Sequence, residues 1–201
     1  MLMPVLLILA VVVSASLAGV LALSTWRKRR ENRFKKGLDA ESAVLHKYIP
    51  HFVMVPSFRA YSKKEAIEKL VEMAGERFPE IVCNVEHAKQ AVFDREESMP
   101  TGLDNGIAVP HGRTDGVRQI AGVLALVDNS ENDNGIIPDY DTIDHSKIQI
   151  LCLTLIPDSI ITPYLQLIAA FIRILQDPDT REQLHSCQTS EDMGDFFRSV
   201  I

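Results

Sequence analysis

The chain has few of the residues from which common catalytic and metal centres are built. It contains only three cysteines among 201 residues, and none of them belongs to a C-x-x-C pair. Their odd number and wide spacing argue against a disulfide framework and a zinc site, and no close spacing of His, Cys and carboxylate residues indicates another metal. A G-x-S-x-G serine elbow, a Walker loop and a dinucleotide-binding glycine fingerprint are also missing. We therefore expect no metal and no cofactor.

Charged side chains are missing from residues 1–25, and residues 5–23 are a nearly continuous run of Val, Leu, Ile and Ala. About 20 apolar residues are enough for one helix to cross the hydrocarbon core of a bilayer. A cleaved signal peptide would have a basic start and a shorter apolar core, and a buried core helix would be shorter and amphipathic. We therefore predict a transmembrane helix over residues 1–26 that contacts the lipid bilayer through residues 3–26.

The segment after this run is strongly basic. Residues 27–36 carry seven of the chain's 21 Lys and Arg side chains and one of its 27 Asp and Glu side chains. Lys and Arg beside a spanning helix mark the cytoplasmic side, which predicts a single-pass protein of the cell membrane whose carboxyl-terminal domain is cytoplasmic. Such a cluster can also bind nucleic acid, but beside a spanning helix contact with anionic lipid is favoured. Residues 37–201 hold 14 basic against 26 acidic side chains, which argues against a nucleic-acid partner.

The composition divides the chain into a transmembrane helix over 1–26, a basic juxtamembrane linker over 27–48 and one folded domain over 49–201. Within the domain, β-rich or continuously apolar runs predict strands at 51–55, 119–128 and 147–156. Helical spacing and N-cap residues predict helices at 62–78, 84–97, 162–175, 177–187 and 189–200. The alternation of strands and helices predicts an α/β fold, in which a mixed β-sheet is flanked by helices on both sides.

One of the six histidines, His111, has a sequence context that favours a chemical role over a packing role. The short apolar run 107–109 before it predicts a strand whose end presents the imidazole. Pro110 fixes the backbone before the ring, and Gly112 leaves room for another molecule to approach. A single histidine is more often a surface or satisfied core residue. An imidazole in this context can nevertheless act as a nucleophile, whose covalent adducts are labile enough to pass a group onward.

The stretch "FDREESMPTGLDNGIAVPHGRT", residues 93–114, strongly resembles the signature of the type-2 enzyme IIA domain of the bacterial phosphoenolpyruvate-dependent sugar phosphotransferase system. This is the fructose, mannitol and nitrogen-regulatory family. The matching positions are Arg95 and Glu96 of "DRE", Thr101 with Gly102, and the run 106–112, "GIAVPHG". The similarity extends over about residues 50–201, through the segments that resemble the family's first helix, later strand and closing helices.

The resemblance implies a role for each matched residue. His111 would be the phosphoryl acceptor, taking the group from the phosphohistidine of the carrier protein HPr and passing it to a IIB component. Arg95 would stabilise the phosphoryl group, since a guanidinium suits phosphate oxygens. Thr101 and Gly112 would lie at the phosphate. Without the resemblance, Arg95 would be interpreted as a surface residue paired with a neighbouring carboxylate.

The chain departs from the family pattern at Tyr164. Members commonly carry a second active-site histidine at this position, at the start of the helix after the central strand. A tyrosine is neutral at pH 7, so it can hydrogen-bond a phosphate but cannot bring an imidazolium charge. Two hypotheses follow. In the first, the chain is a membrane-anchored enzyme IIA-like phosphocarrier that exchanges phosphate with HPr and a IIB domain. In the second, it is a non-transferring regulatory module that binds and modulates a membrane transporter or a kinase.

Overall fold

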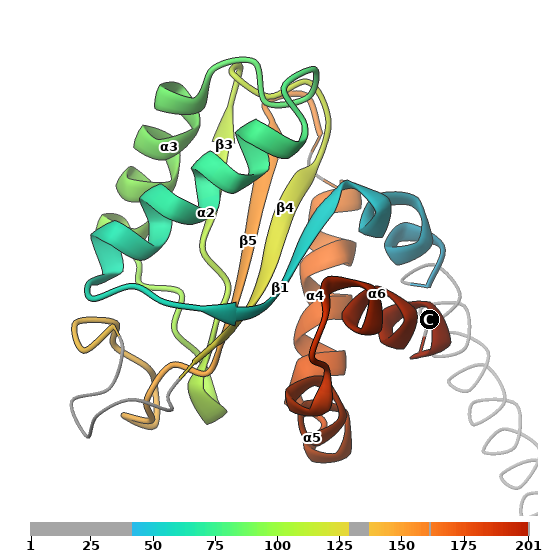
Figure 1. Cartoon of the computed structure of the whole chain (residues 1–201). Helices are drawn as coiled ribbons and strands as arrows, with labels where there is room; N and C mark the ends of the chain where they lie inside the picture. The colour runs from blue at the N-terminus through green and yellow to red at the C-terminus, as the bar shows by residue number, and fades with distance from the viewer. Residues whose placement is uncertain (1–41, 129–136, 161, 201) are drawn as a thin grey trace, which may run out of the picture. The chain divides into compact units, whose positions relative to one another are not determined.

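The computed structural model describes residues 42–128, 137–160 and 162–200 (Figure 1). The elements in these ranges belong to one compact unit, residues 41–201. The transmembrane helix predicted over residues 1–26 lies outside the described residues, as does most of the predicted linker. Within the ranges that are described, no helix has the length and apolar character needed to cross a bilayer.

A five-stranded mixed β-sheet forms the centre of the unit (Figure 1). Its strands are β1 (Phe52–Phe58), β2 (Ile107–Ala108), β3 (His111–Thr114), β4 (Ala121–Val127) and β5 (Ile150–Pro157). β1 pairs with β4 in parallel, β4 pairs with β5 in antiparallel orientation, and β5 pairs in parallel with both β2 and β3. Pro56 interrupts the pairing of β1, which tolerates it because β1 is an edge strand.

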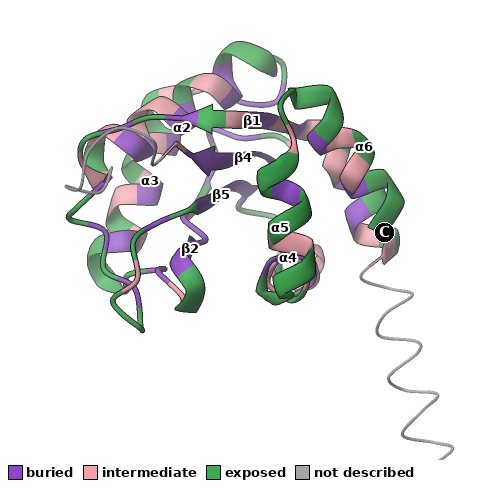
Figure 2. Ribbon diagram, turned by 60° about the horizontal axis from the view of Figure 1, so that its bottom comes forward, coloured by how far each residue is buried: buried purple, intermediate pink, exposed green. Residues whose placement is uncertain are grey.

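Every residue of β4 and β5 is buried, as expected for central strands covered on both faces (Figure 2). Alternate residues of β5 enter two different hydrophobic clusters: Leu151, Leu153 and Leu155 join one, and Ile150 and Cys152 join the other. This period of two follows from the pleat of the strand. Burial also raises the pKa of the Cys152 thiol far above its usual range, so this cysteine is a packing residue.

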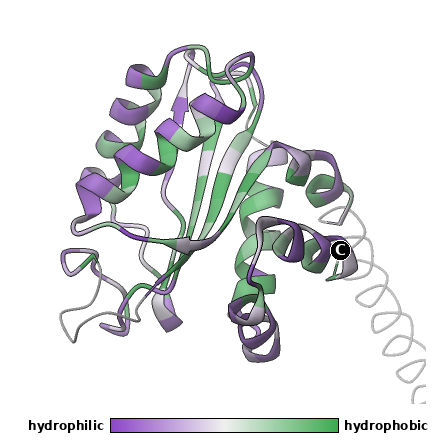
Figure 3. Cartoon of the chain, in the orientation of Figure 1, coloured by the Kyte–Doolittle hydropathy of each residue, from purple (hydrophilic) through white to green (hydrophobic). Residues whose placement is uncertain are grey.

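Helices cover both faces of the sheet. Those over the first cluster are α2 (Lys63–Arg77) and α3 (Val85–Ser98), and those over the second are α4 (Thr162–Gln176), α5 (Pro178–Ser186) and α6 (Ser190–Val200). Two short 3-10 helices, η1 (Ile49–His51) and η2 (Asp104–Gly106), flank β1 and β2. Hydrophobic residues concentrate on the strands and α4, whereas α2 and α3 carry many hydrophilic residues (Figure 3). The predicted α/β fold with a mixed sheet between helical layers is therefore confirmed.

The structure contains the side-chain N-caps from which the starts of three helices are predicted. The Ser62 hydroxyl accepts a hydrogen bond from the Glu65 amide at 3.1 Å, and the Asn84 side chain accepts one from the His87 amide at 3.1 Å. Thr189 accepts from the Asp192 amide at the same distance. Each cap satisfies an amide that the first helical turn leaves without a partner.

Residues 42–48 are helical and belong to the folded core, whereas the sequence predicts a linker up to residue 48. Leu45 and Tyr48 are each only 2% exposed and pack into the cluster beneath α4 and α6. The two residues lie three positions apart, so they share one face of the short helix. The core therefore begins before the boundary at residue 49 that the composition suggests, because these contacts are tertiary and leave little local signal.

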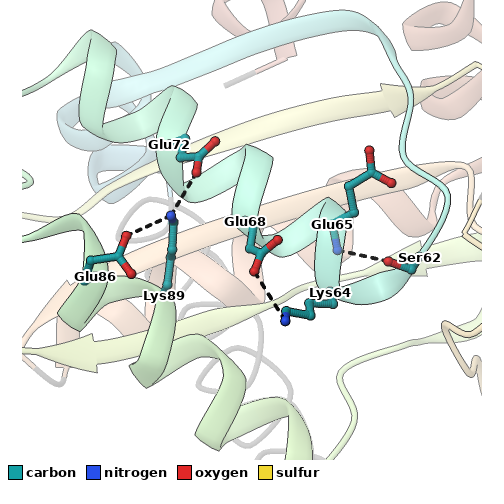
Figure 4. A network of polar contacts seen from close by, with 7 residues as sticks. All are labelled: Ser62, Lys64, Glu65, Glu68, Glu72, Glu86 and Lys89. Atoms are coloured by element: carbon teal, nitrogen blue, oxygen red, sulfur yellow. Dashed lines mark hydrogen bonds and ion pairs between the residues drawn. The ribbon is translucent and has the colours of Figure 1, made fainter.

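Lys89 joins α2 to α3 at one end of the helix pair (Figure 4). Its ammonium lies 2.8 Å from the Glu72 carboxylate of α2 and 2.9 Å from that of Glu86 on its own helix. The hydrogen bond to Glu72, then that to Glu86, raises the pKa of Lys89 above its usual range. The two carboxylates thus hold the end of α2 against the start of α3.

Candidate functional site

β2 and β3 are two parts of one interrupted strand, and His111 stands directly after the interruption. The register against β5 is continuous, because Ala108 lies opposite Leu151 and His111 lies opposite Thr154. Pro110 between them has no amide hydrogen to donate, although its carbonyl still accepts from the Thr154 amide at 2.9 Å. At this break the Val109 carbonyl is available to the imidazole of His111, which turns back towards it.

The two ring nitrogens of His111 have different partners. Nδ1 lies 3.0 Å from the Val109 carbonyl oxygen, which can only accept, so Nδ1 carries the hydrogen. Nε2 then bears a lone pair, and it accepts a hydrogen bond from Nε of Arg95 at 3.0 Å. The backbone thus selects one tautomer and leaves Nε2 as the nucleophilic atom of the ring.

Arg95 reaches His111 from the last turn of α3, across 16 positions of sequence. A second nitrogen of its guanidinium donates to the Met99 carbonyl at 2.7 Å. This carbonyl lies just beyond the end of α3, so the bond fixes the guanidinium plane and also caps the helix. The arrangement holds a permanent positive charge beside the half-buried imidazole.

Tyr164 packs against the His111 ring from the first turn of α4. The two ring centroids lie 5.3 Å apart, with the ring planes tilted by 40°. Burial raises the pKa of the Tyr164 phenol to about 12, although the charge of Arg95 opposes this shift. The hydroxyl therefore keeps its proton near neutral pH. The sequence-predicted residues Arg95, His111 and Tyr164 are thus brought together by the fold.

Thr101 and Gly112, which the sequence analysis places at a bound phosphate, make contacts with other parts of the domain. Thr101 is 6% exposed, and its hydroxyl donates a short hydrogen bond to the buried Glu96 carboxylate and lies 3.3 Å from the Tyr140 hydroxyl. Gly112 is buried against α3. We therefore assign Thr101 to a buried polar cluster with Glu96 and Tyr140, and Gly112 to the packing of α3 on β3. The prediction that both lie at a bound phosphate stays untested.

Gly112 allows α3 to approach β3 closely enough for Arg95 to reach His111. A Cβ atom at this position would lie 2.7 Å from the Val92 amide nitrogen and 2.8 Å from Val92 Cγ2. We expect Gly112→Ala to lower the free energy of unfolding by about 1–3 kcal/mol, because overpacking forces the helix outward. Urea unfolding of the full-length protein measures this. Gly194→Ala in α6 is the control, since its Cβ would meet only the Arg198 guanidinium at 3.4 Å. Equal stabilities of the two variants would contradict the packing role.

The environment of His111 favours the neutral ring. Burial lowers the pKa of His111 below the usual 6.5; the hydrogen bond to the Val109 carbonyl opposes this shift, the charge of Arg95 adds to it, and Glu96 opposes it least. Because the folded pKa lies below the unfolded one, unfolded chains bind more protons between the two values, so stability is lost as pH falls through that window. We expect a histidine titration by NMR to give a midpoint below 6.5 for His111, which rises in Arg95→Gln. A midpoint at or above 6.5 in the unmodified protein would contradict this assignment.

Two features of the site have weak signals in the sequence. The Val109 carbonyl is a backbone group and therefore leaves no residue-type signal at all. The buried cluster of Glu96, Thr101 and Tyr140 includes a contact between Thr101 and Tyr140, which lie 39 positions apart. Burial, and then Glu96, raises the pKa of the Tyr140 hydroxyl well above its usual value. The sequence shows that Glu96 follows Arg95, but it does not show that Glu96 is buried, because this depends on the path of the loop that carries Tyr140.

Comparison with known proteins identifies the fold and the family. A family model described as "Phosphoenolpyruvate-dependent sugar phosphotransferase system, EIIA 2" matches residues 48–200. A nitrogen regulatory protein of Pseudomonas aeruginosa is 30% identical over 135 residues, which cover 65% of this chain and 79% of that protein. The fructose-specific EIIA component of Haloferax volcanii is 29% identical over 140 residues, which cover 70% of this chain and 85% of that protein.

Solved structures share the fold at lower identity. The nitrogen regulatory protein IIA-Ntr of Neisseria meningitidis superposes with a TM-score of 0.58 at 22% identity, over 73% of this chain and 92% of that one. The mannitol enzyme IIA of Escherichia coli, in its complex with phosphorylated enzyme IIB, superposes with a TM-score of 0.54 at 20% identity, over 73% and 94% of the two chains. Because the family model spans most of the chain, including the interrupted strand with His111, this protein belongs to the EIIA type-2 family of the phosphoenolpyruvate-dependent sugar phosphotransferase system.

Proposed function

We propose that the domain is a phosphohistidine carrier in which Nε2 of His111 accepts a phosphoryl group from an HPr-like donor and passes it to a IIB component. The observation that carries this proposal is the hydrogen-bond arrangement of the ring. Nδ1 holds its hydrogen against the Val109 carbonyl, and Nε2 presents a lone pair next to Arg95. An imidazole fixed in one tautomer, and kept neutral by burial, is ready to act as a nucleophile.

The transfer step balances without a further reactant. A bond forms between Nε2 of His111 and phosphorus while the bond between phosphorus and the donor's histidine nitrogen breaks. The electron pair of that broken bond stays on the donor imidazole, and the hydrogen on Nδ1 of His111 remains with the Val109 carbonyl. Phosphoryl transfer of this kind depends mainly on in-line positioning and charge stabilisation. Arg95 supplies the charge, since its guanidinium is held beside Nε2, where the oxygens of the incoming group would arrive.

Tyr164 favours the regulatory hypothesis as the second candidate. Its neutral phenol packs at the position where many family members carry a second histidine, and it cannot supply an imidazolium charge. Several relatives are named nitrogen regulatory protein, among them those of Pseudomonas aeruginosa and Escherichia coli. In this alternative the domain binds and modulates a transporter or a kinase, and does not pass phosphate on.

A chase experiment separates the two functions. The full-length protein is incubated with labelled phosphoenolpyruvate, enzyme I and HPr, and then mixed with a purified IIB domain. Acid-labile label that moves from His111 to the IIB domain supports the carrier. Label that forms and then stays on the chain supports the regulatory module. If no label forms at all, the carrier proposal is wrong and binding alone remains.

We also propose that residues 3–26 anchor the protein in the cell membrane with the domain on the cytoplasmic side. The uncharged apolar run and the basic segment after it support this. The expected result is that the full-length protein stays with the membrane fraction at alkaline pH, while external protease leaves the domain intact in whole cells. Release by alkali would contradict an integral anchor.

A further inference from the structure

A chain of hydrogen bonds runs from the Glu96 carboxylate to the imidazole of His111. Glu96 lies in the last turn of α3 and is only 3% exposed. One of its carboxylate oxygens accepts from the Thr101 amide at 3.3 Å, and the other accepts from the Thr101 hydroxyl. The Thr101 carbonyl accepts from the Val109 amide at 3.2 Å, and the Val109 carbonyl accepts from Nδ1 of His111 at 3.0 Å. The buried carboxylate is therefore connected to the ring through the backbone of two residues.

The backbone that carries the Val109 carbonyl is paired with the loop after α3. Residues 101–103 run antiparallel to residues 107–109. At one end of this pairing the Leu103 amide donates to the Ile107 carbonyl at 2.7 Å, and at the other end the Val109 amide donates to the loop. The loop therefore sets where the Val109 carbonyl lies, and the buried carboxylate holds the loop.

The same loop also holds the partner of the other ring nitrogen. The guanidinium of Arg95 donates to the Met99 carbonyl at 2.7 Å and to Nε2 of His111 at 3.0 Å. Arg95 and Glu96 are neighbours at the end of α3, and their side chains bind the loop at positions 99 and 101. Both partners of the imidazole thus depend on one short loop.

The bond between Thr101 and Glu96 is buried, so its loss has no easy replacement. Thr101 is 6% exposed, and the Tyr140 hydroxyl lies 3.3 Å from the Thr101 hydroxyl oxygen. Because the hydrogen of Thr101 goes to Glu96, Tyr140 is the donor in this second contact. Removal of the Thr101 hydroxyl would leave one carboxylate oxygen and the Tyr140 hydroxyl without this partner, in surroundings where an unpaired polar group is costly.

We propose that Glu96 and Thr101 are positioning residues for phosphoryl transfer. Through the peptide groups of Val109 they hold His111 in the tautomer that has its hydrogen on Nδ1 and its lone pair on Nε2. The link to transfer rests on the proposed function, in which Nε2 attacks phosphorus. In this role neither residue touches the phosphoryl group, and the effect of each reaches the reaction through the ring.

The test measures the tautomer of His111 in the unphosphorylated full-length protein. With ¹⁵N-labelled histidines at about pH 8, where the ring is neutral, NMR gives the ratio of the Nδ1–H to the Nε2–H form. Thr101→Val is nearly isosteric and keeps every charge. It should lower this ratio about tenfold, since one hydrogen bond of ordinary strength changes an equilibrium constant by about that factor. Thr101→Ser keeps the hydroxyl and should keep the ratio of the unmodified protein.

Two further variants separate positioning from a general loss of stability. Thr114→Val removes another buried hydroxyl, which accepts from the Gly116 amide at 3.1 Å and lies outside the chain of bonds to His111. It should leave the ratio unchanged. Glu96→Gln offers one acceptor oxygen in place of two, so it should lower the ratio, and it decides the matter if Thr101→Val does not fold. The proposal is overturned if Thr101→Val has the same ratio as Thr101→Ser, or if Thr114→Val lowers it equally.

The consequence for transfer is measured separately. Single-turnover labelling by phosphorylated HPr should be about tenfold slower in Thr101→Val, with an unchanged half-saturating concentration of HPr, because the ring changes and the docking surface does not. A lower tautomer ratio with an unchanged rate would overturn the positioning role in transfer. Absence of labelling in the unmodified protein would instead overturn the proposed function, and the tautomer ratios, which need no phosphoryl donor, would still decide whether Glu96 and Thr101 hold the ring.

Discussion

His111→Gln is expected to abolish phosphorylation of the full-length protein by enzyme I, HPr and phosphoenolpyruvate. A glutamine side chain can replace some hydrogen bonds of the ring, but it has no nitrogen lone pair that can attack phosphorus. Removal of a covalent nucleophile lowers the rate of a reaction by about three orders of magnitude or more. The incorporation of labelled, acid-labile phosphate measures the effect.

His87→Gln is the matched control for this variant. His87 is an exposed histidine on α3, with Nδ1 3.2 Å from an Asp115 carboxylate oxygen, and it takes no part in the contacts of His111. The control should incorporate phosphate like the unmodified protein. If His111→Gln is labelled normally, or if His87→Gln loses its label as well, His111 is not the specific acceptor.

Arg95→Gln should slow phosphoryl transfer to His111 by about 10²–10³-fold, the loss typical when one preorganised charge-stabilising donor is removed. The variant loses the positive charge that faces the incoming group and the Nε hydrogen bond that orients Nε2. The transfer rate of Arg95→Lys should lie between those of the unmodified protein and Arg95→Gln, because an ammonium keeps the charge but lacks the planar fork of the guanidinium. Single-turnover transfer from phosphorylated HPr measures these rates.

Arg113→Gln serves as the control for Arg95. Arg113 is exposed, follows His111 by two residues, and has its guanidinium Nε 3.7 Å from an Asp158 carboxylate oxygen. Its removal changes the local charge equally without touching the imidazole. Equal losses of rate in the two variants would show that only the net charge near the site matters, and that the contact between Arg95 and Nε2 does not.

The sequence predicts the layers of this fold because their signals are local. Cap residues such as Ser62 and Asn84 lie next to the amides that they satisfy, and the apolar run of β5 follows from burial on both faces. The burial of the helical segment 42–48 in the core escapes such an analysis. Its buried residues Leu45 and Tyr48 belong to a cluster whose other members include residues of α4 and α6, more than 100 positions away in the sequence.

The candidate site is predictable in its residue types and less so in its geometry. The resemblance selects His111, Arg95 and Tyr164, and the fold brings their side chains into contact. It also selects Gly112, where the structure shows a packing role, because a Cβ at this position would collide with Val92 of α3. Which nitrogen of the ring is free depends on a bond to the Val109 carbonyl, which lies where the strand is interrupted at Pro110.

The most direct test of the central claim is to find which ring nitrogen carries the phosphate. The full-length protein, labelled with ¹⁵N in its histidines, is phosphorylated and examined by ³¹P and ¹⁵N NMR. The account predicts a single phosphohistidine, with phosphorus bonded to Nε2 of His111 and the hydrogen still on Nδ1. Phosphate on Nδ1, or on any other residue, would contradict it.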